Sequence, residues 1–218
     1  MSWTERWTSG GHSVQPRYNQ FKHGNCQVGC GPVAWAMLFG WVDRQAGTGN
    51  AYWAQRWGLY RQNGGTGADA LAPLTQDVGV ENMIKEIHGY VGTFCWGNSG
   101  ATFPFTMQFA VRYFFNRTAA TLRIGFSDLG IPWNYMRDRV IDSIVNRGTP
   151  AVIGTGWLTH YPMAYGYRWR TYTVRHKFLF WSWTTEETDR AFYVNNGWGG
   201  SGNEWVSANT WFSGEIFP

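Results

Sequence analysis

Cys30 has neighbours in the sequence that would allow a cysteine to react as a nucleophile as well as to serve a structural role. It follows Gly29, precedes Gly31-Pro32 and opens the apolar stretch 33–38. Proline suits the first turn of a helix because it presets φ and lacks an N–H that would go unsatisfied there. Cys30 is therefore predicted at a helix N-terminus, where partial positive charge favours a thiolate over a thiol. Such a thiolate is a nucleophile for a carbonyl carbon.

Two later segments carry the groups that a nucleophilic thiolate needs. His160 opens His160-Tyr161-Pro162, and Asn196 opens Asn196-Gly197-Trp198-Gly199. A histidine that is charged as imidazolium in the resting pair can hold the thiolate and then protonate the leaving amine. A carboxamide can fix the plane of that imidazole, as the third member of a catalytic triad does. The order cysteine, histidine, asparagine therefore predicts covalent catalysis.

Residues 30–42 are predicted to form a buried central helix with Cys30 at its tip. The segment is apolar on most sides, and a helix that is apolar nearly all round is usually buried. Asp43-Arg44 and Gly47-Thr48-Gly49 are expected to end it. Residues 1–29 contain several turn formers and no apolar periodicity, so they are predicted to be a wrapping arm or loop.

Other segments before residue 150 are predicted mainly from the spacing of apolar residues. The clearest helical face, with the spacing i, i+3, i+4 and i+7, is formed by Val80, Met83, Ile84 and Ile87. The same kind of spacing predicts helices over 107–114 and 136–145, and aromatic residues favour a short helix over 50–60. The Gly- and Ser-rich residues 89–101 are expected to be irregular.

After Pro150 the pattern changes to strands separated by turn residues. The predicted strands cover 151–155, 163–170, 177–183, 191–194 and 205–206, and one earlier strand covers 121–126. Helices followed by an antiparallel sheet indicate an α+β chain with two packed lobes. We expect one domain over 1–218, mainly helical to about residue 120 and mainly β over 121–218. The active site is then expected in the cleft between the lobes.

Composition excludes several classes of protein. Charged residues make up only 15% of the 218 residues and aromatic residues 18%, which argues against disorder. The net charge of +4 comes without a cluster of Lys and Arg, so we expect no nucleic-acid partner. No apolar run approaches 20 residues, so we expect no membrane span. Neither Cys-x-x-Cys nor His-Glu-x-x-His spacing occurs, and we expect no metal and no cofactor.

The three cysteines leave two interpretations open. If two of them pair, they are most simply Cys26 and Cys95, which leaves Cys30 free for chemistry. A reduced chain with three thiols is the other interpretation. The first residues lack the basic-then-apolar pattern of a signal peptide. We favour a secreted, mature form over a cytoplasmic protein, and the sequence leaves the oligomeric state open.

Three local patterns resemble the papain-like cysteine peptidase superfamily. The segment 29–37 is similar to the nucleophile helix of streptopain-like bacterial enzymes, His160 with Gly166-Tyr167 to the family's histidine strand, and residues 196–199 to its Asn-Ser-Trp-Gly. The spacing of cysteine and histidine also agrees with this group. The resemblance implies a papain-like two-lobed fold, with Cys30, His160 and Asn196 as catalytic residues and Trp198 covering the His160–Asn196 contact. His12, His23, His88 and His176 lack the Gly-Tyr continuation.

The resemblance also implies a glutamine that donates to the oxyanion beside the backbone N–H of Cys30. The usual spacing falls on Gly24, so this role departs from the family pattern. Gln20 follows Tyr18 in an aromatic-x-Gln pattern similar to the streptopain type and is the first choice. His23 and Gln27 are the alternatives.

The function expected from the resemblance is a thiol protease that hydrolyses peptide bonds in peptide or protein substrates through a Cys30 thioester. A deamidase or acyltransferase toxin or effector domain on the same fold is an alternative. A third hypothesis of another class is a glycan-binding or catalytically inactive module, since the chain has 15 Trp and exposed aromatic rings can stack on sugars.

Overall fold

Helices and antiparallel strands are both present in this protein, which confirms the α+β prediction. The computed structural model describes residues 2–54, 72–114 and 120–217. The segment 107–114 is divided between a 3-10 helix η4 (Pro104–Ala110) and α4 (Val111–Phe114), and the described part of 50–60 forms α2 (Ala51–Ala54). The rest of that predicted helix lies outside the described residues.

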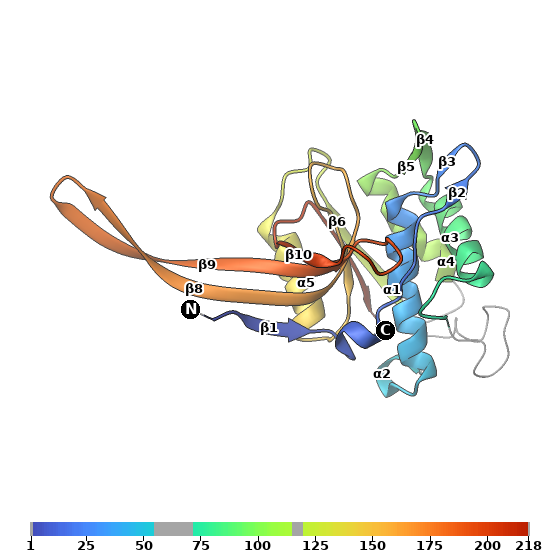
Figure 1. The fold of residues 1–218 in the computed structure, drawn as a ribbon, viewed down its shortest axis with the longest axis horizontal. Helices are drawn as coiled ribbons and strands as arrows, with labels where there is room; N and C mark the ends of the chain where they lie inside the picture. Colours follow the sequence, from blue (N-terminus) through green and yellow to red (C-terminus); the bar gives the residue numbers. More distant parts are fainter. Residues whose placement is uncertain (1, 55–71, 115–119, 218) are drawn as a thin grey trace.

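The central helix α1 (Cys30–Gly47) is buried along most of its length, as predicted. It packs against α3 (Val78–Val91) on one side and against strands on the other, and α2 lies at its C-terminal end (Figure 1). It is longer than the predicted 30–42 because Arg44, Gln45 and Ala46 favour a helix. The N–H of Thr48 bonds the carbonyls of Arg44 and Ala46 at its end.

Helix α3 (Val78–Val91) confirms the helical pattern read from residues 80–87. All four residues of the predicted face are buried, and the side chain of Asp77 accepts a 2.8 Å hydrogen bond from the N–H of Val80. An aspartate in this position satisfies an N–H that the helix itself leaves free. The cap explains why the helix begins where it does.

Residues 94–101 are not irregular, and that prediction was wrong. They form a hairpin of β4 (Phe94–Trp96) and β5 (Ser99–Ala101) joined by Gly97-Asn98. Gly97 has φ 59°, which suits a two-residue turn. A disulfide between Cys26 and Cys95 ties β4 to β3 (Cys26–Gln27), which pairs with β2 (Lys22–His23). Closing a loop of 69 residues lowers the conformational entropy of the unfolded chain. In the chain-entropy model this raises the free energy of unfolding by about 4 kcal/mol.

Among the described residues the main sheet has seven strands in the order β10-β9-β8-β7-β11-β6, and β1 pairs with β8 off this path. All pairings are antiparallel. The strands are β1 (Thr4–Trp7), β6 (Thr121–Phe126), β7 (Ala151–Ile153), β8 (Met163–Phe178), β9 (Trp181–Asn195), β10 (Glu204–Ser207) and β11 (Phe212–Phe217).

Two regions that contain strands were not predicted. The segment 1–29 was expected to be an arm or loop, yet it holds β1, β2, β3 and a 3-10 helix η1 (Gly11–Val14). Strand β11 was missed because its interior Ser213-Gly214-Glu215 has no apolar alternation. Glu215 is fully buried there and pairs with Arg139 of α5 (Asn134–Val145) at 2.6 Å, so an ion pair compensates the charge inside the sheet.

Strands β8 and β9 form one long hairpin where three short strands were predicted. The predicted strand 177–183 contains the hairpin turn itself, at Leu179-Phe180. The turn was missed because both of its residues are apolar rather than Gly, Asn or Asp. Figure 1 shows the outer part of this hairpin extending from the body of the molecule, and we call it the arm, residues 170–190.

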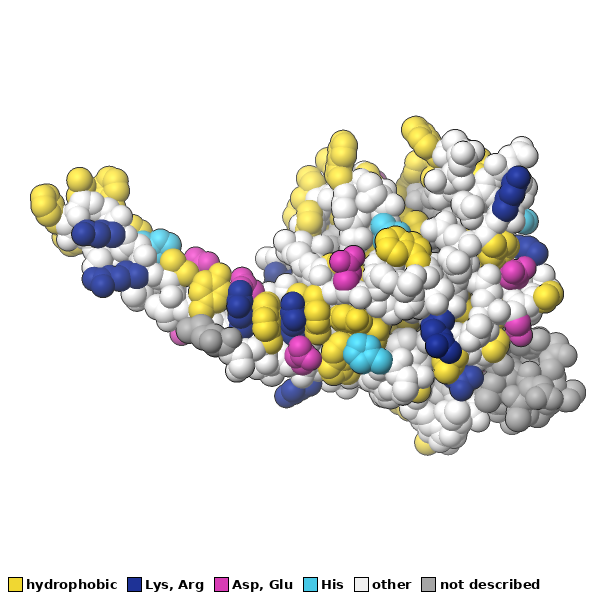
Figure 2. Space-filling view, viewed as in Figure 1, with side chains coloured by type: hydrophobic (Ala, Val, Ile, Leu, Met, Phe, Trp, Pro, Cys, Tyr) yellow, Lys and Arg dark blue, Asp and Glu magenta, His cyan; other side chains and the backbone are white. Residues whose placement is uncertain are grey.

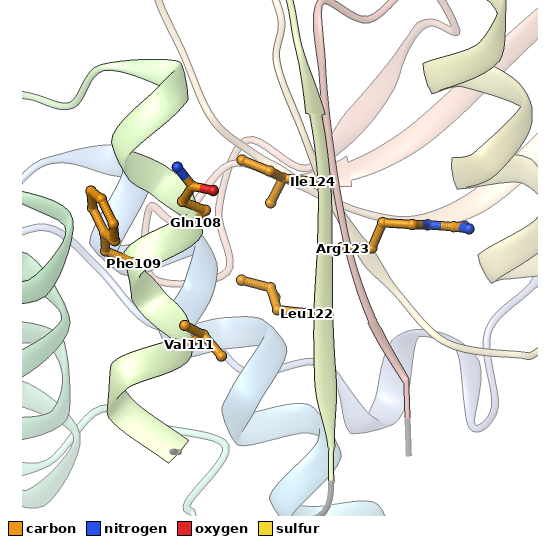
Figure 3. A pocket seen from close by; sticks show the side chains of 6 residues that line it. All are labelled: Gln108, Phe109, Val111, Leu122, Arg123 and Ile124. Atoms are coloured by element: carbon orange, nitrogen blue, oxygen red, sulfur yellow. The ribbon is translucent and has the colours of Figure 1, made fainter.

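The residues that the structure describes form two hydrophobic cores, one around α1 and one between α5 and the sheet. A cavity of about 470 Å³ lies between η4–α4 and β6 (Figure 3). Apolar side chains line most of it, and Figure 3 shows the side chain of Arg123 turned away from the facing helix.

Candidate active site

Cys30 is the first residue of α1, as predicted, and it is the free cysteine of the described chain. Its predecessor Gly29 has φ 95°, a value that L residues rarely adopt. A Cβ at Gly29 would also lie 3.1 Å from the carbonyl oxygen of Gly100. Glycine is therefore required before Cys30 by both the turn and the close approach of β5.

The thiol of Cys30 is surrounded by backbone N–H groups but is also largely shielded from water. Burial raises its pKa above the ordinary value of 9.0, and this effect is larger than the opposing hydrogen bonds from the backbone N–H groups of Tyr161, Cys30 and Gly31. The expected dominance of the helix N-terminus is therefore not observed. The resting sulfur is favoured as a thiol.

The backbone of Tyr161 brings the histidine segment to Cys30. The backbone N–H of Tyr161 donates to the sulfur of Cys30, and the side-chain hydroxyl of Tyr161 donates to the carbonyl of Thr102 at 3.1 Å. Tyr161 follows His160, whose carbonyl accepts a 2.9 Å hydrogen bond from the N–H of Thr155. The turn over 156–159 thus returns the chain to the sheet with His160 beside the residue that contacts Cys30.

Asn196 lies against the ring of His160. Burial lowers the pKa of His160 below its ordinary 6.5, while the side chain and the backbone carbonyl of Asn196 both raise it. The Nε2 atom of His160 is buried and has no hydrogen-bond partner within the described residues. The Nδ2 atom of Asn196 donates to the carbonyl of Gly202 at 2.6 Å, which leaves its side-chain oxygen for the imidazole.

Trp198 covers the histidine from the solvent side. The two rings stack with centroids 5.6 Å apart and planes inclined by 29°. The indole is itself 47% exposed, so it lies between His160 and water. This contact contributes to the burial that lowers the pKa of His160.

A loop of the N-terminal segment, residues 18–21, contacts both the asparagine loop and the residues before Cys30. The N–H of Gly199 bonds the carbonyl of Tyr18 at 3.0 Å, and Asn19 forms a bridge with Trp198. Two residues further on, the carbonyl of Phe21 accepts a 2.9 Å hydrogen bond from the N–H of Val28. Gln20 is half-buried and lies between these two anchor points, one on the asparagine loop and one just before Cys30.

The other two candidates for the oxyanion role, His23 and Gln27, lie in the β2–β3 hairpin. His23 is in β2 and packs its ring against His88, with centroids 4.9 Å apart. Gln27 is in β3 with an exposed side chain, and its backbone N–H bonds the carbonyl of Asn98. The remaining histidines are also elsewhere: His12 bonds Tyr165, and His176 lies on the arm.

Exposed apolar side chains rise on both sides of the site. On the helical side Phe103 and Phe105 stack at 5.3 Å. On the sheet side Trp157 is 78% exposed and its Nε1 donates to the carbonyl of Leu129 at 3.0 Å. Figure 2 shows a hollow between two raised apolar regions, one over β4–β5 and one over the loops that follow β6 and β7.

Tyr161 and the turn before His160 were not singled out from the sequence. The only available signal for Tyr161 was its position next to His160. Leu158 in this turn has φ 56°, an unusual value for a bulky residue, and nothing in the residue order predicts it. Both contributions depend on backbone geometry, which a side-chain pattern does not reveal.

No group of three His, Cys, Asp or Glu that could hold a metal ion occurs in residues 2–54, 72–114 and 120–217. The same ranges contain no helix long and apolar enough to cross a membrane. A scan against protein-family models finds no match for the chain, and a search of curated proteins finds none either.

Proposed function

We propose that this protein is a papain-like cysteine peptidase that hydrolyses amide bonds through a thioester at Cys30. One observation carries the proposal: the sulfur at the tip of α1 contacts the backbone of Tyr161, next to a shielded His160 whose ring faces Asn196. Nucleophile, acid–base group and orienting amide come from three segments far apart in sequence.

The first step follows from the charge states of the resting site. Because Cys30 is favoured as a thiol and His160 as a neutral imidazole, His160 acts as a general base. It takes the proton of Cys30 while the sulfur bonds to the carbonyl carbon, whose π electrons move to oxygen. Asn196 stabilises the imidazolium that forms, since its two carbonyl oxygens raise the pKa of His160.

The tetrahedral intermediate needs two donors for its oxygen. The backbone N–H of Cys30 is one, and its place at the start of α1 leaves it without a partner inside the helix. We assign the second to the side-chain amide of Gln20, which lies between the asparagine loop and the start of α1. Donors of this kind are worth roughly 10²- to 10³-fold in kcat.

The remaining steps regenerate the enzyme. The carbon–nitrogen bond breaks as His160 returns its proton to the leaving amine, and the acyl group stays on Cys30 as a thioester. Water then attacks the thioester, giving a proton to His160, and the carbon–sulfur bond breaks. The carboxylic acid leaves, and the sulfur takes back its proton.

Three features support the finer parts of the proposal. The nucleophile belongs to the helical half and its partners to the sheet half, as in a two-lobed papain-like fold. The aromatic walls favour substrates with apolar side chains next to the scissile bond. The Cys26–Cys95 disulfide favours an oxidising compartment, in line with a secreted protein.

The decisive experiment combines labelling with product analysis. The wild-type protein is treated with a peptidyl acyloxymethyl ketone carrying Phe, the modified residue is mapped by mass spectrometry, and a peptide library is digested in parallel. We expect Cys30 to be the labelled residue and the library to be cleaved, with both signals lost in Cys30→Ala. A one-unit mass gain without cleavage would indicate a deamidase, and an added acyl group an acyltransferase. Glycan binding without labelling would overturn the proposal.

A further inference from the structure

The arm extends beyond every strand that braces the sheet. On its inner part, β8 pairs with β1 up to Trp169, and β9 pairs with β10 from Ala191 onward. Beyond these points the two strands pair only with each other, and residues 170–190 include no buried residue. A two-stranded ribbon of this kind is marginally stable by itself. Its length therefore contributes little to the core and calls for another role.

The apex of the arm is strongly apolar. Phe178, Leu179, Phe180 and Trp181 are 66%, 71%, 98% and 76% exposed. Leu179 occupies the turn with φ 51°, where glycine or asparagine would be less strained. An exposed leucine in a strained turn indicates that its side chain, rather than the turn, is what matters at this position.

Charge is distributed unevenly along the arm. The outer twelve residues, 174–185, which we call the arm tip, contain Arg175 and Lys177 and no acidic residue. The acidic side chains lie further in: Glu186 and Glu187 follow the tip, and Asp189 pairs with Arg170 at 2.8 Å. The arm tip is thus cationic as well as apolar, while the inner part of the arm carries both basic and acidic side chains.

Strand register sorts the two kinds of side chain onto opposite faces of the arm tip. Phe178 lies opposite Trp181, and His176 lies opposite Trp183 with their rings stacked at 5.2 Å. Lys177 and Arg175, one residue out of phase with these, point to the other face together with Ser182 and Thr184. The ribbon is therefore amphipathic, with an aromatic face, a basic face and an apolar apex.

We propose that the arm tip inserts into the surface of an anionic lipid membrane and holds the protein there. Aromatic rings are favoured at the interface between headgroups and acyl chains, and neighbouring Lys and Arg are attracted to anionic headgroups. The apex lies at the far end of the arm (Figure 2) and its apolar side chains are 66% to 98% exposed, so a fluid surface can cover it all round, whereas a flat protein surface would contact only one side.

Vesicle co-sedimentation tests the proposal with the Cys30→Ala protein, so that proteolysis plays no part and lipid binding is read independently of the proposed function. Vesicles contain phosphatidylcholine alone or with 30% phosphatidylserine. We expect binding to the anionic vesicles, at least tenfold tighter than to the neutral ones, and about tenfold weaker binding in 0.5 M than in 0.1 M salt.

Substitutions at the tip then separate its two components. Phe180→Asp is expected to weaken binding at least tenfold, and Arg175→Ser with Lys177→Ser to abolish the preference for phosphatidylserine. Val78→Asp is the matched control, since Val78 is 72% exposed on the helical half, and it should bind like the parent.

Three results would overturn the proposal: no sedimentation with anionic vesicles, unchanged sedimentation of Phe180→Asp, or equal loss in Val78→Asp. Analytical ultracentrifugation without lipid identifies the alternative in the first case. Self-association that Phe180→Asp removes would assign the tip to a second copy of this chain.

Discussion

Two turns in the described part of the chain hold a leucine with positive φ, and they differ in what surrounds them. Leu158, with φ 56°, lies two residues before His160, and Leu179, with φ 51°, lies at the end of the arm. The turn at Leu158 is fixed by the Thr155–His160 bridge and by Trp211, whose Nε1 donates to the carbonyl of Gly156 at 2.8 Å. The turn at Leu179 is held only by its own two strands.

The different surroundings of the two turns indicate which region of the molecule needs precise backbone geometry. A strained residue costs on the order of 1–3 kcal/mol and persists when the surrounding structure compensates. At the candidate active site that compensation comes from several segments and fixes the backbone that carries His160, on which the proposed chemistry depends. At the arm tip the strain exposes an apolar side chain whose exact position is unimportant. Matched substitutions in the two regions test this contrast.

The largest contrast is expected between two histidines. His160→Ala should lower kcat/KM by about 10³- to 10⁴-fold because it removes the proton carrier. His176→Ala on the arm should change kcat/KM less than twofold. Hydrolysis of a fluorogenic peptide, with circular dichroism to check folding, measures both. Equal losses in the two variants would disprove the assignment of His160.

The next contrast concerns two glutamines on the helical side. Gln20→Ala should lower kcat by roughly 10²- to 10³-fold with a small change in KM, because the lost hydrogen bond forms mainly in the transition state. Gln27→Ala, with its exposed side chain in β3, should retain full activity. Steady-state kinetics decide between them, and the reverse result would move the oxyanion role to Gln27.

A smaller effect is expected on the pH profile. Since burial lowers the pKa of His160 below 6.5 and raises that of Cys30 above 9.0, the neutral pair that we propose as reactive exists between these values. kcat/KM should therefore rise through an acidic limb below pH 6.5, stay level, and fall only above pH 9.0. An acidic limb well above pH 6.5 would contradict this assignment.

Trp198→Ala should move that acidic limb upward, toward pH 6.5, because water then reaches the ring of His160 and its protonated form is less penalised. Trp183→Ala, which removes a stacked indole from the arm, should leave the limb unchanged. The pH dependence of kcat/KM over pH 4–10 provides the measurement. A shift of the same size in both variants would show that Trp198 has no specific role.

The smallest effects are expected from the two leucines themselves. Leu158→Gly should lower kcat a few-fold, since glycine loosens the turn that carries His160. Leu179→Gly should leave kcat unchanged while weakening vesicle binding, since it keeps the turn and removes the apolar side chain. Parallel kinetics and co-sedimentation give both numbers. A kinetic defect in Leu179→Gly would show that the arm acts on the active site.

Much of the helical part of the fold was predictable from local pattern. The buried helix after Cys30 and the amphipathic α3 follow from apolar periodicity, which reports one face of a helix directly. Strand β6 and helix α5 were found in the same way. Strand β11 and the β4–β5 hairpin were not, because Ser, Gly and Glu inside a strand, or a short strand of three residues, give no alternation to detect.

Local sequence also determined which residues could do chemistry: a cysteine after glycine at a helix start, a histidine before the sheet, and an asparagine followed by Gly-Trp-Gly. Tertiary structure alone decided that Tyr161 donates to the sulfur, that burial outweighs the helix N-terminus at Cys30, and that β8 and β9 continue into an arm. Residue types and spacing carry the first kind of information. Burial, backbone contacts and strand partners depend on segments distant in sequence, so they exist only after folding.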